Sequence, residues 1–261
     1  MKVVILCGGQ GTRIRNVNEN LPKPMLPIVG LPILWHIMKY YSGYGFTDFV
    51  LCLGYKGQVI KDFFLNYESQ TRDLTVTLGS KQRIQYHTSH KEEDWRVTLA
   101  DTGLNSMTGS RIAKIKHYIG TDKLFLLTYG DGVGNIDLVS LVEFHKSHGK
   151  ILTVTGVRPP GRFGELMHDE QGLLTEFNEK PQATGGRISG GYFVCDRRLF
   201  DYLAADDNLV FEEGPMKNLV KDKQLMVFKH DGFWQPMDTF RDFSYLNRLV
   251  ENGVAPWITW R

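Results

Sequence analysis

Apolar and polar positions along the first 157 residues follow a pattern that predicts strands interleaved with helices. Continuous apolar runs at Lys2–Cys7, Phe49–Leu53 and Leu124–Leu127 are typical of strands buried on both faces. Between the first two runs, apolar residues recur at helical spacing from Pro32 to Tyr44, and Gly45 follows. Strands that alternate with helices indicate a parallel sheet with helices on both faces.

Two further helices are predicted before residue 150. Ile112, Ile115 and Ile119 share one face of the first helix. The second helix has Asp137 where an N-cap is expected and Gly149 where the chain must leave the helix. Both helices extend the alternation of the first third of the chain.

The pattern changes after residue 158 to short β segments separated by Gly and Pro. Glu165–His168 and Leu173–Asn178 flank Asp169-Glu170-Gln171-Gly172, which is typical of a hairpin turn. Helical spacing returns at residues 239–252. We therefore expect a single α/β domain over residues 1–261, with a doubly wound, mainly parallel sheet and a smaller β-rich region. Its two halves would cover about residues 1–157 and 158–261.

Composition and charge narrow the functional classes. Thirty-one Lys and Arg against 29 Asp and Glu give a net charge of +2, which lacks the excess of positive charge typical of proteins that bind duplex nucleic acid. The apolar runs are shorter than a signal peptide or a membrane helix requires. Cys7, Cys52 and Cys195 lie in apolar runs without metal-ligand spacing. We expect a cytoplasmic protein with buried reduced thiols and no nucleic-acid or membrane partner.

A glycine loop, Gly8-Gly9-Gln10-Gly11-Thr12-Arg13, follows the first predicted strand. Glycines let backbone N–H groups approach phosphate oxygens. The loop is neither a Walker A motif nor the dinucleotide fingerprint, because no Gly-Lys-Ser/Thr follows and Ile14 stands where a small residue is needed. Residues 1–25 carry Lys2, Arg13, Arg15 and Lys23 against Glu19. This local charge favours a polyphosphate ligand over a plain turn with solvated arginines.

Two acidic residues are candidates for further chemistry. Asp131 follows the run Leu124–Leu127, so its carboxylate is expected at the edge where parallel sheets bind ligands. A carboxylate there can hold Mg²⁺, although Asp-Gly is also a common turn. Asp238 precedes a predicted helix that starts at Thr239, and an N-cap is the alternative for it.

These motifs, taken in order, resemble those of sugar-1-phosphate nucleotidylyltransferases. The matching motifs are Gly8-Gly9-Gln10-Gly11-Thr12-Arg13, Lys23-Pro24-Met25, Pro32-Ile33-Leu34, Tyr129-Gly130-Asp131-Gly132, Glu179-Lys180-Pro181 and Gly190-Gly191. Further segments, at residues 34–39, 106–109, 159–164 and 232–238, resemble the branch of that family that transfers cytidylyl groups. The resemblance extends to residues 255–257.

The resemblance implies a Rossmann-like nucleotidyltransferase fold and transfer of the cytidylyl group of CTP to α-D-glucose 1-phosphate, with Mg²⁺ as cofactor. It makes Arg13, Lys23 and Asp131 catalytic, and Asp131 with Asp238 the metal ligands. The nucleotide contacts that it implies are Leu6, Gly8, Gly9, Gln10, Gly11, Thr12, Arg13, Lys23, Thr108, Arg111 and Gly130. The sugar-phosphate contacts that it implies are Gly164, Glu179, Lys180, Gly191, Tyr192 and Trp234.

The resemblance also implies a homo-oligomer, with a hexamer among the expected forms, and subunit contacts within residues 66–100. The product would supply activated sugar for deoxysugar or O-antigen polysaccharide synthesis. From the residues alone, Gly190-Gly191 also suits a β-bulge and Trp234 a core position.

Two alternatives remain open at the level of sequence. One is a transferase that uses UTP, dTTP or another sugar 1-phosphate, since Arg111 and Thr108 could donate to O2, which cytosine and uracil share. The absence of Pro-x-Thr between Arg15 and Leu21 leans toward the cytidylyl branch. The other alternative is a nucleotide-sugar-binding protein without catalysis. Against it stands the joint presence of Arg13, Lys23, Asp131, Lys180 and Asp238.

Overall fold

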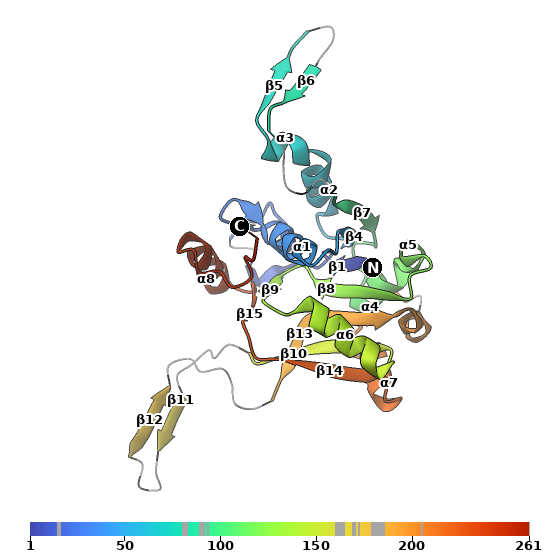
Figure 1. Ribbon diagram of the computed structural model, residues 1–261, viewed down its shortest axis with the longest axis vertical. Coiled ribbons are helices and arrows are strands. Elements are labelled where there is room, and N and C mark those ends of the chain that lie inside the picture. The colour runs from blue at the N-terminus through green and yellow to red at the C-terminus, as the bar shows by residue number, and fades with distance from the viewer. Residues whose placement is uncertain are drawn as a thin grey trace.

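The computed structural model describes the chain except at residues 15–16, 80–82, 89–91, 93, 160–164, 169–170, 172, 179–185, 205 and 261. Within the described residues, seven strands form one sheet in the order β14-β10-β13-β8-β1-β4-β7 (Figure 1). These strands are β1 (Val3–Leu6), β4 (Asp48–Leu53), β7 (Arg96–Asp101), β8 (Leu124–Tyr129), β10 (Leu152–Val157), β13 (Ile188–Asp196) and β14 (Leu225–His230).

The sheet is mainly parallel, and this confirms the predicted fold class. β1 is parallel to β4 and β8, β4 is parallel to β7, and β10 is parallel to β14. β13 is antiparallel to both β8 and β10, which the alternation of strands and helices did not predict. A parallel pair needs a crossover, usually a helix, whereas the chain between β10 and β13 runs through a β hairpin. β13 therefore enters the sheet in the opposite direction.

The two faces of the sheet are covered by two separate sets of apolar side chains. Along β1, Val3 and Ile5 belong to one core cluster and Val4 and Leu6 to the other. This division follows from the strand, in which successive side chains point to opposite faces. The first cluster includes residues of helices α1 (Ile33–Gly43), α6 (Leu138–His148) and α8 (Phe240–Glu251). The second cluster includes residues of α4 (Thr108–Lys114), α5 (Lys116–Ile119), α7 (Pro215–Lys221) and the 3-10 helix η3 (Arg197–Tyr202). The sheet is doubly wound, as predicted.

Two hairpins project from the sheet in Figure 1. One is β5 (Leu74–Thr77) with β6 (Arg83–Tyr86), which follows α2 (Gly57–Leu65) and α3 (Tyr67–Thr71). The other is β11 (Glu165–His168) with β12 (Leu174–Asn178), and it confirms the hairpin predicted there. Two further two-stranded sheets are formed by β2 (Pro27–Ile28) with β3 (Leu31–Pro32) and by β9 (Gly132–Gly134) with β15 (Trp234–Pro236).

One predicted helix is wrong in detail, and one open alternative is excluded. The helix expected through Ile112, Ile115 and Ile119 is broken, because the backbone of Ile115 leaves the helical conformation between α4 and α5. All three isoleucines are nevertheless buried in one cluster. The N-cap of α8 is Thr239, which forms a capping box with Asp242, so Asp238 does not cap this helix. The carboxylate of Asp238 accepts instead from the Nζ atom of Lys23.

Other local predictions are confirmed. Asp137 caps α6 by accepting from the N–H groups of Val139 and Ser140, and Gly149 is its C-cap. The three cysteines are buried and free. Among the described residues, the helices are too short or too polar to cross a bilayer.

Candidate active site

The glycine loop leaves the carboxyl end of β1 and lines a cavity of about 470 Å³. The N–H of Cys7 donates to the carbonyl of Cys52 at 3.0 Å, which holds the start of the loop against β4. Gly11 has a φ of +59°, a left-handed conformation that glycine adopts without strain. A side chain at Gly11 would also approach Cβ of Lys23 to 3.0 Å. The loop and Lys23 are thus packed closely together.

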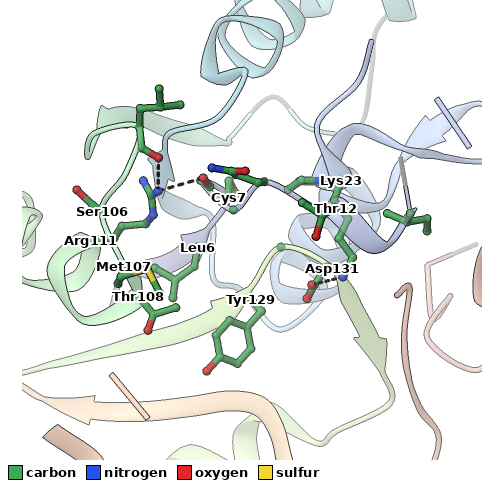
Figure 2. Close-up of a pocket in the computed structure, with 18 of the residues that line it drawn as sticks. Leu6, Cys7, Thr12, Lys23, Ser106, Met107, Thr108, Arg111, Tyr129 and Asp131 are labelled. Carbon is green, nitrogen blue, oxygen red and sulfur yellow. Dashed lines mark hydrogen bonds and ion pairs between the residues drawn. The ribbon is translucent and has the colours of Figure 1, made fainter. Parts of the chain in front are cut away.

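The structure brings most of the predicted nucleotide-binding residues to this one cavity (Figure 2). Those that line it are Leu6, Gly8, Gly9, Gln10, Gly11, Thr12, Lys23, Thr108, Arg111 and Gly130, together with the predicted metal ligands Asp131 and Asp238. Arg13 lies in the 3-10 helix η1 (Thr12–Ile14), and its side chain is outside the described part of the chain. Asp238 belongs to the second half of the sequence, so both halves contribute to the cavity.

Lys23, Asp131 and Asp238 meet in an ion cluster at one side of the cavity. The Nζ atom of Lys23 donates to Oδ2 of Asp131 at 2.6 Å and to Oδ1 of Asp238 at 2.5 Å. Lys23 lies in the 3-10 helix η2 (Lys23–Met25), Asp131 between β8 and β9, and Asp238 between β15 and α8. Burial alone would lower the pKa of Lys23, but attraction to Asp131 and the hydrogen bonds to both carboxylates raise it. The ammonium is therefore fully charged near neutral pH.

Hydrogen bonds hold the main chain at both aspartates independently of Lys23. The N–H of Met237 donates to the carbonyl of Asp131 at 2.8 Å, and the N–H of Asp238 donates to Asp242 at 3.1 Å. Within the described residues, no group of three or more His, Cys, Asp or Glu side chains could hold a metal. Two converging carboxylates nevertheless suit Mg²⁺, which is usually bound through one or two carboxylates plus waters and substrate phosphates.

Arg111 connects the opposite side of the cavity to the ends of three strands. Its Nη1 donates to the carbonyls of Leu53 at 3.0 Å and Gly103 at 2.7 Å, and its Nη2 donates to the carbonyl of Gly8 at 3.0 Å. A side chain at Gly8 would collide with the guanidinium. Burial lowers the pKa of Arg111, which is 4% exposed. Arg111 thus holds the glycine loop in place, and its predicted contact with a base stays a prediction.

Glu212 joins two walls of the cavity, and no sequence pattern singled it out. Its carboxylate accepts from the Thr108 hydroxyl at 2.7 Å and from the Tyr129 hydroxyl. Burial, and then the nearby Glu212 carboxylate, raise the pKa of Tyr129. The Tyr129 ring packs where a side chain at Gly191 would lie. Glu212 lies in a turn beside Glu213, and nothing in the sequence distinguishes the two, so only the fold reveals this contact.

The residues predicted to contact the sugar phosphate are, where the structure describes them, not among those that line this cavity. Gly164, Glu179 and Lys180 lie outside the described residues. Tyr192 is 2% exposed and its ring stacks on Tyr41, so its backbone would have to make any sugar contact. The Trp234 indole N–H donates to the carbonyl of Gly190 at 2.7 Å and its ring packs on the core, in line with the alternative of a core position.

The glycine pair before Tyr192 lies at an irregularity in the sheet. The register between β10 and β13 shifts between Val154 and Gly156, opposite this pair. Gly191 has a φ of +75°, within the left-handed region. The β-bulge that the glycine pair suited is therefore present.

Comparison with known proteins identifies the family. The family model described as nucleotidyl transferase matches residues 2–252. The chain belongs to the nucleotidyl transferase family. This transferase is 48% identical, over all 261 residues and the whole of each relative, to the glucose-1-phosphate cytidylyltransferases of Salmonella typhi and Salmonella typhimurium.

A solved structure of related fold extends the comparison. The crystal structure of HddC from Yersinia pseudotuberculosis superimposes with a TM-score of 0.66 at 23% identity, covering 95% of this transferase and 99% of HddC. At that identity the superposition supports the fold alone. The resemblance that the sequence motifs carry is confirmed by the family match and by the full-length relatives.

Proposed function

We propose that this transferase moves the cytidylyl group of CTP to α-D-glucose 1-phosphate and releases CDP-glucose and pyrophosphate. The observation that carries the proposal is the ion cluster of Lys23, Asp131 and Asp238 beside the glycine loop in one cavity. The full-length identity of 48% to glucose-1-phosphate cytidylyltransferases supports the choice of both substrates.

The chemistry requires positioning and charge neutralisation rather than a general base. The sugar phosphate is largely a dianion at neutral pH, because the second pKa of a phosphate monoester is about 6. One of its oxygens forms a bond to the α-phosphorus of CTP. The bond from that phosphorus to the oxygen bridging to the β-phosphorus breaks, and pyrophosphate leaves with the electron pair. The barrier lies mainly in repulsion between anions, which fixed donors and cations reduce.

The groups at the cavity and the residues predicted on the sugar side have separate parts in this proposal. The N–H groups of the glycine loop and Arg13 would hold the triphosphate, and Lys23 would neutralise the α-phosphoryl group. Lys180 would orient the attacking phosphate. The roles of Gly164, Glu179, Gly191 and Trp234 on the sugar side stay predictions.

Asp131 and Asp238 would hold Mg²⁺, because two carboxylate oxygens converge there on one cation already. When bound, the metal would add positive charge near the phosphates. The supply of activated sugar for deoxysugar or O-antigen synthesis stays a prediction.

Pyrophosphate release tests the proposal. Purified protein with Mg²⁺ and glucose 1-phosphate is given CTP, UTP or dTTP in separate reactions, with reactions lacking sugar phosphate as the control. We expect kcat/KM for CTP to exceed that for UTP and dTTP by at least about a hundredfold, because a site that pairs with one base edge leaves polar groups unpaired with another. Equal rates with UTP would favour a transferase that accepts more than one pyrimidine nucleotide. No release with any nucleotide would favour the binding protein without catalysis.

A further inference from the structure

The ion cluster places the Lys23 ammonium between the two carboxylates proposed to hold the metal. The distances are 2.6 Å to Asp131 and 2.5 Å to Asp238, and the Lys23 side chain is 10% exposed. The two carboxylate oxygens are therefore no farther apart than two short hydrogen bonds. A cation that these two oxygens coordinate together would compete with the ammonium for the same position.

The charges explain why a cation is needed there. Two carboxylates this close repel each other when both are ionised, and the repulsion is strong in a partly buried site. Their backbones are held by the hydrogen bonds of Asp131 with Met237 and of Asp238 with Asp242, so the carboxylates can separate only by rotation of their side chains. One ammonium reduces the repulsion and leaves the cluster with a net charge of −1. A divalent cation would neutralise the pair completely.

The cavity proposed to take the triphosphate offers the ammonium an alternative partner. Lys23 packs against Gly11 of the glycine loop, and both line the cavity proposed to take the triphosphate. A lysine carries its charge on a flexible stem with three rotatable donors. Rotation of this stem can therefore turn the ammonium from the carboxylates toward the cavity without rearrangement of the backbone.

We propose that Lys23 is an internal counter-ion, which occupies the carboxylate pair in the free protein and yields it to a divalent cation when a nucleotide phosphate accepts the ammonium. This inference rests on the proposed function. It makes nucleotide and metal binding mutually favourable. A bound phosphate draws the ammonium away from the carboxylates, and a bound metal frees the ammonium for the phosphate. The free protein would bind a divalent cation weakly, and the metal would enter together with the nucleotide.

Mn²⁺ binding to the free protein, followed by electron paramagnetic resonance without nucleotide, tests the proposal. We expect Lys23→Met to bind Mn²⁺ at least about tenfold more tightly than the wild type, since removal of a charge-assisted partner frees both carboxylates. Lys2→Met is the matched control, because it removes the same charge from the ion pair with Asp122 and should leave Mn²⁺ affinity unchanged. Asp131→Asn should abolish the gain when combined with Lys23→Met.

A second measurement needs no substitution. Acetylation of the wild-type protein, read by peptide mass spectrometry, should modify Lys23 faster when Mn²⁺ is added, while Lys2 reacts at an unchanged rate. Mn²⁺ affinity of Lys23→Met equal to or weaker than that of the wild type, or Lys23 reactivity indifferent to Mn²⁺, would overturn the counter-ion role. The proposed function would survive that result if CDP-glucose is still formed. Conversely, failure to form CDP-glucose would leave the Mn²⁺ measurements to decide the counter-ion role by themselves.

Discussion

Arg111 shows how one side chain can set the shape of a binding loop. Its guanidinium donates to backbone carbonyls of Gly8, Leu53 and Gly103, which come from three separate segments. A buried carbonyl that loses its donor costs about 1–3 kcal/mol. Arg111 therefore contributes to stability and to the position of the glycine loop at once.

We expect Arg111→Lys to lower the free energy of unfolding by about 1–3 kcal/mol and to raise KM for CTP, because one ammonium cannot reach all of these acceptors. Urea denaturation and steady-state kinetics measure the two effects. Arg198→Lys, at a surface pair with Asp196, is the control and should change neither quantity appreciably. An Arg111→Lys variant with wild-type stability and KM would refute this role.

The sequence predicted the residues of the ion cluster but not the contact between them. Lys23, Asp131 and Asp238 were selected from a charged segment, a strand end and a family resemblance, and the fold brings them within 2.6 Å. Glu212 could not be selected, because its two hydrogen bonds join segments that are adjacent only after folding.

Single elements differ in how fully the sequence specifies them. The limits of α6 follow from Asp137 and Gly149, which act locally. The break at Ile115 does not, because the apolar spacing continues through it and the isoleucines on both sides stay in one core cluster. Local signals therefore specify the ends of helices better than their interruptions.

Helix α1 contains a histidine that links it to the C-terminal segment. Nε2 of His36 lies 3.1 Å from the carbonyl of Ile28, and the Trp257 indole N–H donates to its Nδ1 at 3.4 Å. These partners fit the neutral ring with its proton on Nε2. Burial lowers the pKa of His36 to about 4, although the contact with Ile28 opposes the shift.

This pKa predicts a loss of stability on acidification. The unfolded chain binds a proton on His36 near pH 6.5, whereas the folded chain resists it until about pH 4. The contribution of neutral His36 to the free energy of unfolding is complete above pH 6.5. It falls by about 3 kcal/mol as the pH drops to about 4. His145, whose pKa burial also lowers to about 4, adds to the effect.

Urea denaturation between pH 7.5 and 4.5 tests the contribution of His36. His36→Gln should reduce the slope of the free energy of unfolding against pH by an amount that corresponds to at most about one bound proton. His117→Gln, at an exposed position, should leave this slope unchanged. If His36→Gln kept the wild-type slope of the free energy of unfolding against pH, His36 would not be a source of the pH dependence.

At the scale of the whole molecule, the two halves of the sequence share one sheet. β13 and β14 come from the second half and pair with β8 and β10 of the first. The doubly wound class was predictable because parallel strands are apolar throughout. The direction of β13 was not, since it depends on where the chain returns from the β11–β12 hairpin.

The projecting hairpin of β5 and β6 predicts an oligomer. Val76 and Ile84 are cross-strand partners, 40% and 49% exposed, on a segment that extends away from the sheet (Figure 1). Exposed apolar pairs on an extended arm are typical of contacts between copies. This surface falls within residues 66–100, where the resemblance implies subunit contacts.

We expect light scattering after size-exclusion chromatography to give a mass above 29.9 kDa for the wild type and a smaller assembly for Val76→Asp with Ile84→Asp. Gln85→Asp, on the neighbouring position of the same strand, is the control and should keep the wild-type mass. A monomeric wild type would show that the hairpin has another role.

The most direct test of the proposed reaction is phosphorus NMR of the protein with CTP, glucose 1-phosphate and Mg²⁺. The account predicts that signals of CDP-glucose and pyrophosphate grow in equal amounts. In Asp131→Asn and Asp238→Asn they should grow at least about a hundredfold more slowly, because loss of a metal ligand removes several kcal/mol of charge stabilisation. Asp137→Asn, which alters the cap of α6, should keep a rate close to that of the wild type. Formation of CMP or CDP without CDP-glucose, or wild-type rates in both asparagine variants of the ion cluster, would contradict the account.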